Sequence, residues 1–306
     1  LLHPTALPDS PVCGTFGEPS RRWLHQLANS GIGVWQMLPL SPPDPTGAPY
    51  SSPSCFALNA WLLDASDLAN EQFISQDALN GLPGASLGMA GATLVDFQLA
   101  NQRSEALADA LLAAWPQQAS ERQDAFQHWC SQQSWLEDHV LFSVLHAEHN
   151  NAWWTWPKPL AQHQRRALKA WAADNQAGLM KERLMQWQLD RQWQEIRRLA
   201  QDLGVVLFGD LLMSLNSKDD SSYGGWSGMS LRVTTARAMA GDSLMLIEDG
   251  SARMLRQLHH HHRLAWKPIW LSLQQSTLRC SCQQVPLQPK QPCHLRPRYQ
   301  PIPKCF

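Results

Sequence analysis

The sequence lacks several features that define large classes of proteins. Its 306 residues carry a formal net charge of −1, so the positive excess typical of nucleic-acid-binding proteins is missing. No apolar run approaches the roughly 20 residues of a membrane span, and we expect no secretory leader, since no charged segment followed by an apolar run opens the sequence. The seven cysteines show no framework spacing, which favours reduced thiols and a cytoplasmic location. We therefore expect neither nucleic acid nor a membrane as a partner.

Acidic residues are missing from the end of the chain. Residues 250–306 contain no Asp or Glu, although Arg and Lys continue, and proline is dense there. A folded surface normally mixes both signs of charge, and this region shows no sustained helical or strand period. We expect residues 223–306 to be a divergent tail that is irregular or disordered. A shifted reading frame is one hypothesis for this composition, and an intact frame in the coding region would contradict it.

Cysteine and histidine gather in the same tail, at Cys280, Cys282, Cys293, His294 and the run His259–His262. Thiolate and imidazole ligands suit zinc. However, Cys-x-Cys is not the usual two-residue spacing, and four consecutive histidines cannot all face one ion. We therefore predict no metal site, and keep zinc binding as the alternative.

Two short apolar runs have the surroundings expected of parallel strands. Residues 32–38 follow a helix that Ser20 should cap and Gly31 should end, and residues 205–210 follow a helix that Gly204 should end. Such runs predict strands buried on both faces. A helix, a glycine link, a strand and a polar residue in succession are typical of an α/β barrel.

The region between these strands is helical in its apolar spacing from residue 101 to about 200. We predict an α/β fold, a partial TIM-type (β/α) barrel with a large helical insertion. Residues 1–80 would form the first part of the barrel, 81–178 the inserted subdomain, 179–222 a barrel helix and strand, and 223–306 the tail.

Two residues are candidates for a binding site. Active sites of α/β barrels lie at the carboxyl ends of the strands, where Asp210 follows the second strand and Tyr50 lies in the loop after the first. A carboxylate there could bind sugar hydroxyls, and an aromatic ring could stack on a sugar. The fifteen tryptophans fit a carbohydrate-binding protein, but they also fit a large core. Equally, Asp210 could be a helix cap and Tyr50 ordinary loop packing.

Five segments, in order along the chain, resemble motifs of the amylomaltase (disproportionating enzyme) family of 4-alpha-glucanotransferases. They are residues 1–8 (Leu-Leu-His-Pro-Thr-Ala-Leu-Pro), 35–40 (Trp-Gln-Met-Leu-Pro-Leu), 49–59 (Pro-Tyr-Ser-Ser, continuing to Phe-Ala-Leu-Asn), 153–157 (Trp-Trp-Thr-Trp-Pro) and 190–210 (Asp-Arg-Gln-Trp, then Leu-Phe-Gly-Asp). Five ordered motifs are far more specific than any one of them. The chain is identified as the N-terminal portion of a member of this family.

The resemblance implies a barrel that transfers segments of α-1,4-glucan, or of maltooligosaccharides, to a sugar acceptor without a cofactor. It also implies a retaining double displacement, in which two carboxyl groups about 5–5.5 Å apart act as nucleophile and acid/base. Tyr50 resembles the family's active-site tyrosine, and Asp210 its sugar-binding aspartate. The loop before Tyr50 departs from the family's frequent Gly-Asp-Ser-Pro-Tyr, because Thr46 to Tyr50 read Thr-Gly-Ala-Pro-Tyr.

The resemblance stops after Asp210. Leu212 stands where the family has proline, and residues 216–219 keep only a faint echo of the next motif. The segments that carry the nucleophile and the acid/base are absent, and residues 247–250 (Ile-Glu-Asp-Gly) come too early to replace them. We therefore assign no catalytic residue and expect this polypeptide to lack turnover. A non-catalytic, glucan-binding remnant is the alternative.

Overall fold

The computed structural model describes residues 1–44, 46–54, 56–87, 94–149 and 153–210, and the backbone of 214–215, 235–237, 244–248 and 251–255. The chain separates into two compact units, Leu1–Gln257 and Leu258–Phe306, and every described residue belongs to the first. Within the described residues, none of the helices is long and apolar enough to cross a membrane.

The first helix, α1, spans Glu18–Asn29. Its N-cap is Gly17, not the predicted Ser20, because Pro19 favours the first turn and starts the helix earlier. Ser20 is instead buried, and its hydroxyl donates to the Thr15 carbonyl at 2.5 Å. The predicted end is confirmed, since Gly31 adopts φ +69° directly after the helix.

Strands β1 (Val34–Gln36) and β3 (Val206–Phe208) form the predicted parallel pair, in the register Val34 to Val206 and Gln36 to Phe208. Their predicted burial on both faces is wrong. Trp35 is 2% exposed on the face toward the helices, whereas Val34, Val206 and Phe208 are 53%, 60% and 53% exposed. The described helices cover only one face of this pair, so the apolar residues of the other face stay accessible.

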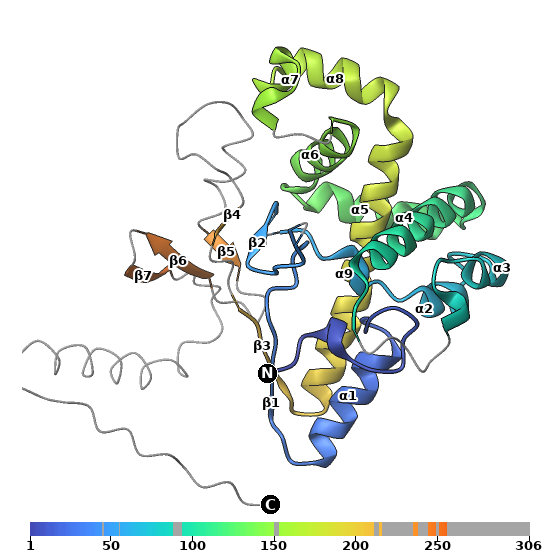
Figure 1. Ribbon diagram of the computed structural model, residues 1–306, viewed down its shortest axis with the longest axis vertical. Helices are drawn as coiled ribbons and strands as arrows, with labels where there is room; N and C mark the ends of the chain where they lie inside the picture. The colour runs from blue at the N-terminus through green and yellow to red at the C-terminus, as the bar shows by residue number, and fades with distance from the viewer. Residues whose placement is uncertain are drawn as a thin grey trace, which may run out of the picture. The chain divides into compact units, whose positions relative to one another are not determined.

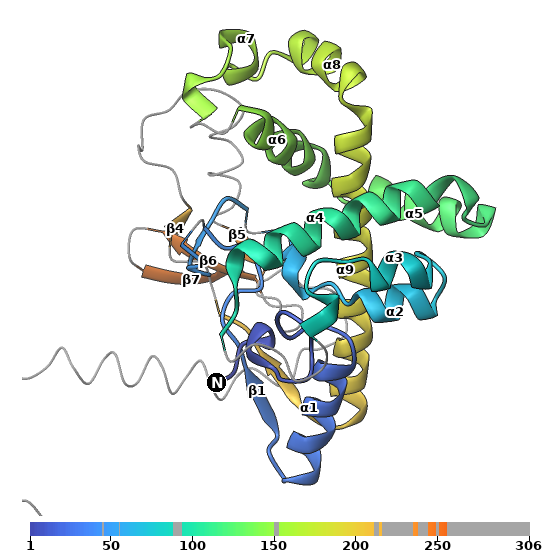
Figure 2. The same ribbon diagram turned by 45° about the vertical axis from the view of Figure 1, so that its right-hand side comes forward.

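Helix α9 (Gln176–Asp202) is the central element. It contacts α1, α4 (Phe97–Ala114), α5 (Ser120–Gln132), α6 (Leu136–His149) and α8 (Arg165–Asp174). Figures 1 and 2 both show α4 crossing α9 and α1 lying beside the end of α9 that leads into β3. That end closes on Gly204 at φ +69°, with the Val205 amide donating to the Ala200 carbonyl at 2.8 Å. Gly204 therefore ends the helix as predicted.

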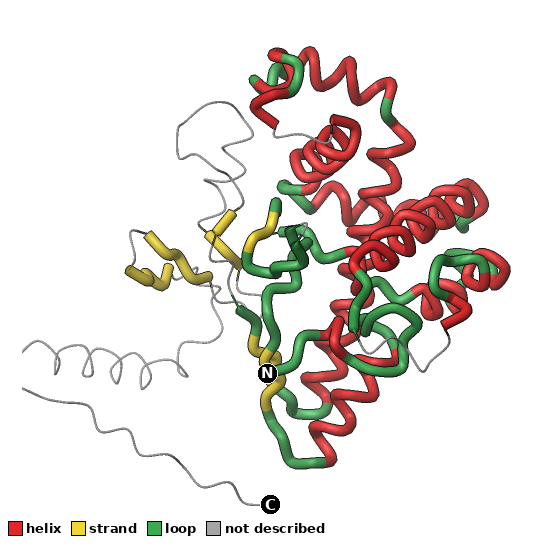
Figure 3. Tube along the Cα trace, in the orientation of Figure 1, coloured by secondary structure: helices red, strands yellow, loops and turns green. Residues whose placement is uncertain are grey.

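The remaining elements are short. They are the 3-10 helices η1 (Pro4–Ala6), η2 (Ala60–Leu62), η3 (Ala85–Leu87), η4 (Trp115–Gln117) and η5 (Trp153–Thr155), the helices α2 (Ala65–Asn70), α3 (Gln76–Asn80) and α7 (Lys158–Ala161), and the strands β2 (Ser51–Ser52) and β4 (Ser214–Leu215), which pair in parallel. Figure 3 shows the helices on one side of this unit and the loops that join β1 to β2 on the other.

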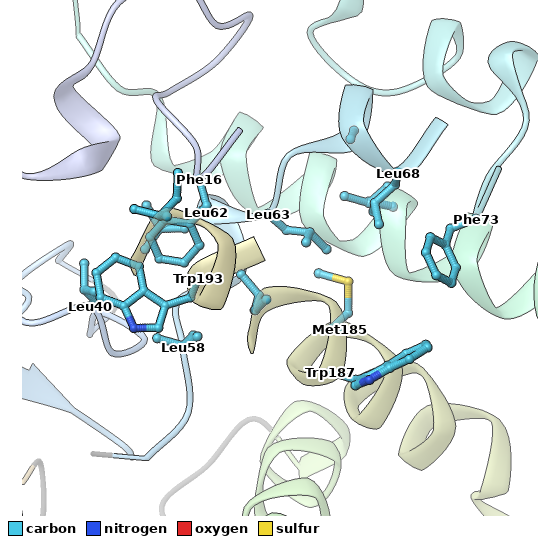
Figure 4. Packing of buried hydrophobic residues seen from close by; sticks show 14 of the residues in the cluster. Phe16, Leu40, Leu58, Leu62, Leu63, Leu68, Phe73, Met185, Trp187 and Trp193 are labelled. Atoms are coloured by element: carbon cyan, nitrogen blue, oxygen red, sulfur yellow. The ribbon is translucent and has the colours of Figure 1, made fainter. Parts of the chain in front are cut away.

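The main hydrophobic core lies between α9 and the N-terminal segments. Trp193 packs against Phe16 with ring centroids 5.0 Å apart, and Trp187 meets Phe73 edge-on at 5.7 Å. Figure 4 shows Met185 and Trp187 of α9 together with residues of the first 73 positions. Because aromatic and aliphatic side chains of both regions interdigitate, α9 is fixed against the segments that precede and follow β1.

Three strands lie in the region for which the sequence indicates no regular element. They are β5 (Thr235–Arg237), β6 (Leu244–Glu248) and β7 (Ser251–Leu255), and they form an antiparallel sheet in the order β5-β6-β7. The rest of the predicted tail, with all residues of the alternative zinc site, lies outside the described residues.

Candidate functional site: a tyrosine–aspartate pair at the strand ends

The two predicted site residues are hydrogen-bonded to each other. The Tyr50 hydroxyl donates to Oδ2 of Asp210 at 2.7 Å, although the residues are 160 positions apart. The contact follows from the parallel pairing of β1 and β3, because the carboxyl ends of parallel strands meet at one edge. The Met37 amide donates to the Phe208 carbonyl at 2.9 Å, so the ladder continues to the point where both chains leave the sheet.

A second parallel pair follows the contact. Strand β2 begins directly after Tyr50, and β4 begins four residues after Asp210. Ser51 is in register with Ser214, and Ser52 with Leu215. The hydrogen bond is therefore bracketed by β1–β3 on one side and β2–β4 on the other. Two ladders, rather than a single flexible contact, bring the tyrosine and the aspartate together.

The loop that carries Tyr50 has its own internal structure. Oδ1 of Asp44 accepts hydrogen bonds from the Thr46 amide at 2.9 Å, the Thr46 hydroxyl at 2.6 Å and the Ala48 amide at 2.9 Å. These bonds, with that of the Thr46 hydroxyl largest, lower the pKa of the Asp44 carboxyl. Gly47 takes φ +81° against Phe97, where a Cβ would lie 2.3 Å from a ring carbon. Asp44 and Gly47 thus shape the loop where its sequence departs from the family pattern.

The electrostatics keep Tyr50 a hydrogen-bond donor. The hydrogen bond to the Asp210 carboxylate raises the pKa of Tyr50, and desolvation and the negative charge of Asp210 add to this rise. The phenol is therefore neutral at physiological pH and donates its proton toward the carboxylate. Asp210 is exposed, so its carboxylate can also accept hydrogen bonds from a ligand. A neutral donor, an anionic acceptor and an aromatic ring at one accessible place suit a polyhydroxylated ligand.

The other residues considered in the sequence analysis do not contribute to the site formed by Tyr50 and Asp210. Glu248 ends strand β6, while Asp249 and residues 216–219 lie outside the described residues. Over the described part of the chain, no group of three or more His, Cys, Asp or Glu side chains is arranged to hold a metal ion. The motif tryptophans fall at and after η5, where Trp154 is half exposed and Trp156 is buried.

Three buried polar residues were not predicted from the sequence, and one of them, Gln186, hydrogen-bonds the backbone of Leu58 next to the loop that carries Tyr50. Gln186, Gln188 and Gln192 are buried on α9, at 3%, 0% and 2% exposure, within a helix otherwise buried through apolar residues. Polar residues that interrupt an apolar helix face are unusual, because a buried amide needs hydrogen-bond partners. The glutamines within the apolar face of this helix are therefore the sequence feature from which these residues could have been predicted.

A parallel strand pair covered on one face by helices defines an α/β protein, and in such proteins binding sites commonly lie at the carboxyl edge of the strands. Residues 2–227 match the 4-alpha-glucanotransferase family, glycoside hydrolase family 77, and the chain belongs to this family.

The relatives are similar over the same region. The chain is 32% identical over 214 residues to a 4-alpha-glucanotransferase of Synechocystis sp., and 31% identical over 214 residues to one of Thermus thermophilus. Each match covers 69% of this chain and 41% of the relative, so the match spans about two fifths of these relatives' length. An amylomaltase of Streptococcus agalactiae in complex with acarbose has the same fold over 69% of this chain and 42% of its own, with a TM-score of 0.63 and 22% identity.

Proposed function

We propose that Tyr50 and Asp210 bind an α-1,4-glucan chain as part of a 4-alpha-glucanotransferase site. In such a site, segments of glucan pass to a sugar acceptor by a retaining double displacement. The observation that carries the proposal is the 2.7 Å hydrogen bond between Tyr50 and Asp210 at the carboxyl edge of a parallel strand pair. Family membership supplies the substrate class.

The two side chains have separate tasks in this proposal. The Asp210 carboxylate accepts hydrogen bonds from sugar hydroxyls, each contributing about 1.5–3 kcal/mol because the acceptor is charged. The Tyr50 ring offers an apolar face to a pyranose, and its hydroxyl fixes one oxygen of the carboxylate. That hydrogen bond orients the carboxylate in the proposed site.

The wider architecture belongs to the same proposal. Residues 1–80 and 179–222 form part of a TIM-type barrel, and residues 81–178 are a helical insertion. The parallel β1–β3 pair and the amylomaltase-like fold support this division. A cytoplasmic location stays a prediction from the cysteine pattern.

The 306-residue polypeptide on its own binds glucan without turning it over. Its sequence contains neither the nucleophile segment nor the acid/base segment of the family, and a covalent mechanism without its nucleophile has no reaction path. We assign Tyr50 and Asp210 to substrate binding and no residue to catalysis.

The experiment is calorimetric titration of the full chain with maltoheptaose, with cellohexaose as the β-linked control. Maltoheptaose should bind, cellohexaose should not, and Asp210→Asn should weaken binding about tenfold or more, the effect of losing a charged acceptor. Equal affinity for both sugars would overturn the proposed ligand. Incubation with maltotriose tests turnover separately: release of glucose and longer oligomers would show that carboxylates we do not recognise perform the reaction.

A further inference from the structure

Two glutamines on α9 hold distant backbone segments in the same way. The Gln186 Oε1 accepts from the Leu58 amide at 2.9 Å, and its Nε2 donates to the Leu58 carbonyl at 3.1 Å. The Gln192 Oε1 accepts from the Asp64 amide at 2.8 Å, and its Nε2 donates to the Asp64 carbonyl at 2.9 Å. Each glutamine therefore satisfies both polar groups of one residue, as a neighbouring β-strand would do.

Only the first of these contacts touches the loop that carries Tyr50. That loop begins after β1, and its two ends are joined where the Asn59 amide donates to the Leu40 carbonyl at 2.8 Å. We call this junction, with the adjacent Leu58, the neck of the loop. Leu58 is the last residue inside the neck, so Gln186 holds the neck itself. Asp64 lies beyond the loop, at the N-cap of α2.

Helix α9 links this neck to the other half of the site. Gln186 lies within the helix, and the helix ends at Asp202, shortly before β3 and Asp210. The core packing of Trp187 and Trp193 fixes the helix along the way. One rigid element thus holds the base of the Tyr50 loop and also leads into the strand that presents Asp210.

A second layer of contacts holds Gln186 in place. Its Nε2 also donates to Oε1 of Glu182 at 3.1 Å, and Nε2 of His139 lies 3.0 Å from the same oxygen. The His139 ring packs on Trp135, which stacks with Phe56 of the Tyr50 loop at 6.1 Å and 14°. Glu182 and His139 therefore orient the side-chain amide of Gln186, and Trp135, the residue before α6, contacts the same part of the loop.

We propose that Gln186 is a positioning residue that sets Tyr50 against Asp210 by holding Leu58 at the neck of the loop. Gln192 makes an equivalent contact without this effect. The inference rests on the site assigned under the proposed function, but its test does not require that the site bind glucan.

The test compares Gln186→Leu with the matched control Gln192→Leu in the full chain. Each change leaves the buried amide and carbonyl of one residue, Leu58 or Asp64, without their glutamine partner, so both should lower the urea midpoint of unfolding. Gln186→Leu also removes the hydrogen bond to Glu182, so its midpoint should fall further. The specific readout is the ionisation of Tyr50, followed by tyrosinate absorbance and isolated by subtracting the titration of Tyr50→Phe. The chain has three tyrosines, which makes this subtraction practical.

In the Gln186→Leu protein we expect the Tyr50 pKa to fall toward the ordinary value of tyrosine, because the hydrogen bond to Asp210 is misaligned. The Gln192→Leu protein should titrate like the wild type. Gln186→Met, whose flexible side chain fills the same space, replaces Gln186→Leu if that variant does not fold. Unchanged Tyr50 titration in a folded Gln186 variant overturns the inference, and so does an equal shift in Gln192→Leu.

Measuring the affinity for maltoheptaose distinguishes a failure of this inference from a failure of the proposed function. Maltoheptaose binding should weaken about tenfold in the Gln186 variant, as for the loss of one hydrogen bond to a charged group, and should persist in Gln192→Leu. If the wild type binds no glucan while the Tyr50 titration still responds to Gln186, the proposed function fails and the positioning role stands.

Discussion

Replacing Gly14 by alanine should dislodge the opening segment of the chain. A Cβ at this position would lie 2.1 Å from the Pro4 carbonyl oxygen and 2.7 Å from Cβ of Leu7. These are backbone and stem atoms, so no side-chain rotation relieves the clash. The Gly14 amide also donates to the Thr5 carbonyl at 2.9 Å, which ties the two segments together.

The size of the effect follows from these contacts. Carbon and oxygen need more than 3 Å, so the segments must separate by about an ångström, which breaks the bond between Gly14 and Thr5. Overpacking costs about 1–3 kcal/mol, and leaving a buried donor and acceptor unpaired costs about 1–3 kcal/mol more. We expect the free energy of unfolding to fall by about 2–6 kcal/mol. The opening segment also holds β1, since the Trp35 indole donates to the Leu2 carbonyl at 2.8 Å.

The assay is urea unfolding followed by tryptophan fluorescence. Gly33→Ala is the control, because a Cβ there has no neighbour within 4 Å and φ is ordinary. The control should change the free energy of unfolding by less than about 1 kcal/mol, with stabilisation as the favoured direction. If Gly14→Ala unfolded at the urea concentration of the wild type, the opening segment would not be packed as described, and the strain argument would be refuted.

Two further predictions, with three substitutions, test the fold. Burial, with the charge of Asp67 second, raises the pKa of Asp64, so the folded state binds its proton more tightly than the unfolded state. Stability should therefore fall as the pH rises above about 4, and Asp64→Asn should flatten that fall in urea midpoints measured from pH 4 to 7. Val206→Thr and Phe208→Thr, on the exposed strand face, should reduce light scattering on heating while lowering stability by less than about 0.5 kcal/mol, and unchanged scattering would contradict an accessible apolar face.

The sequence determined the local elements better than their surroundings. Gly31 and Gly204 ended the helices as predicted, because a left-handed residue after an apolar stripe is a local signal. The parallel pairing of β1 and β3 was also predictable, since each apolar run followed a helix. The burial of these strands on both faces was predicted wrongly, because whether Val206 is covered depends on which other elements pack against the strand pair. An apolar run cannot reveal that.

The site was predictable only in part, for a similar reason. Tyr50 and Asp210 could be placed at one edge from the strand-end rule and the family resemblance. Their direct hydrogen bond and the β2–β4 pair could not, because both join residues far apart in the chain. Gln186 was harder still, since its partner is the backbone of Leu58, which has no side-chain signature. A contact between a side chain and a distant backbone leaves no pattern in the sequence.

Affinity for maltoheptaose in a double-mutant cycle of Tyr50→Phe and Asp210→Asn tests the central claim most directly. If the two residues hold one glucan chain together, each single change weakens binding about tenfold, and the double change weakens it by clearly less than the product of the two. Binding that neither change affects would place the glucan elsewhere and contradict the account.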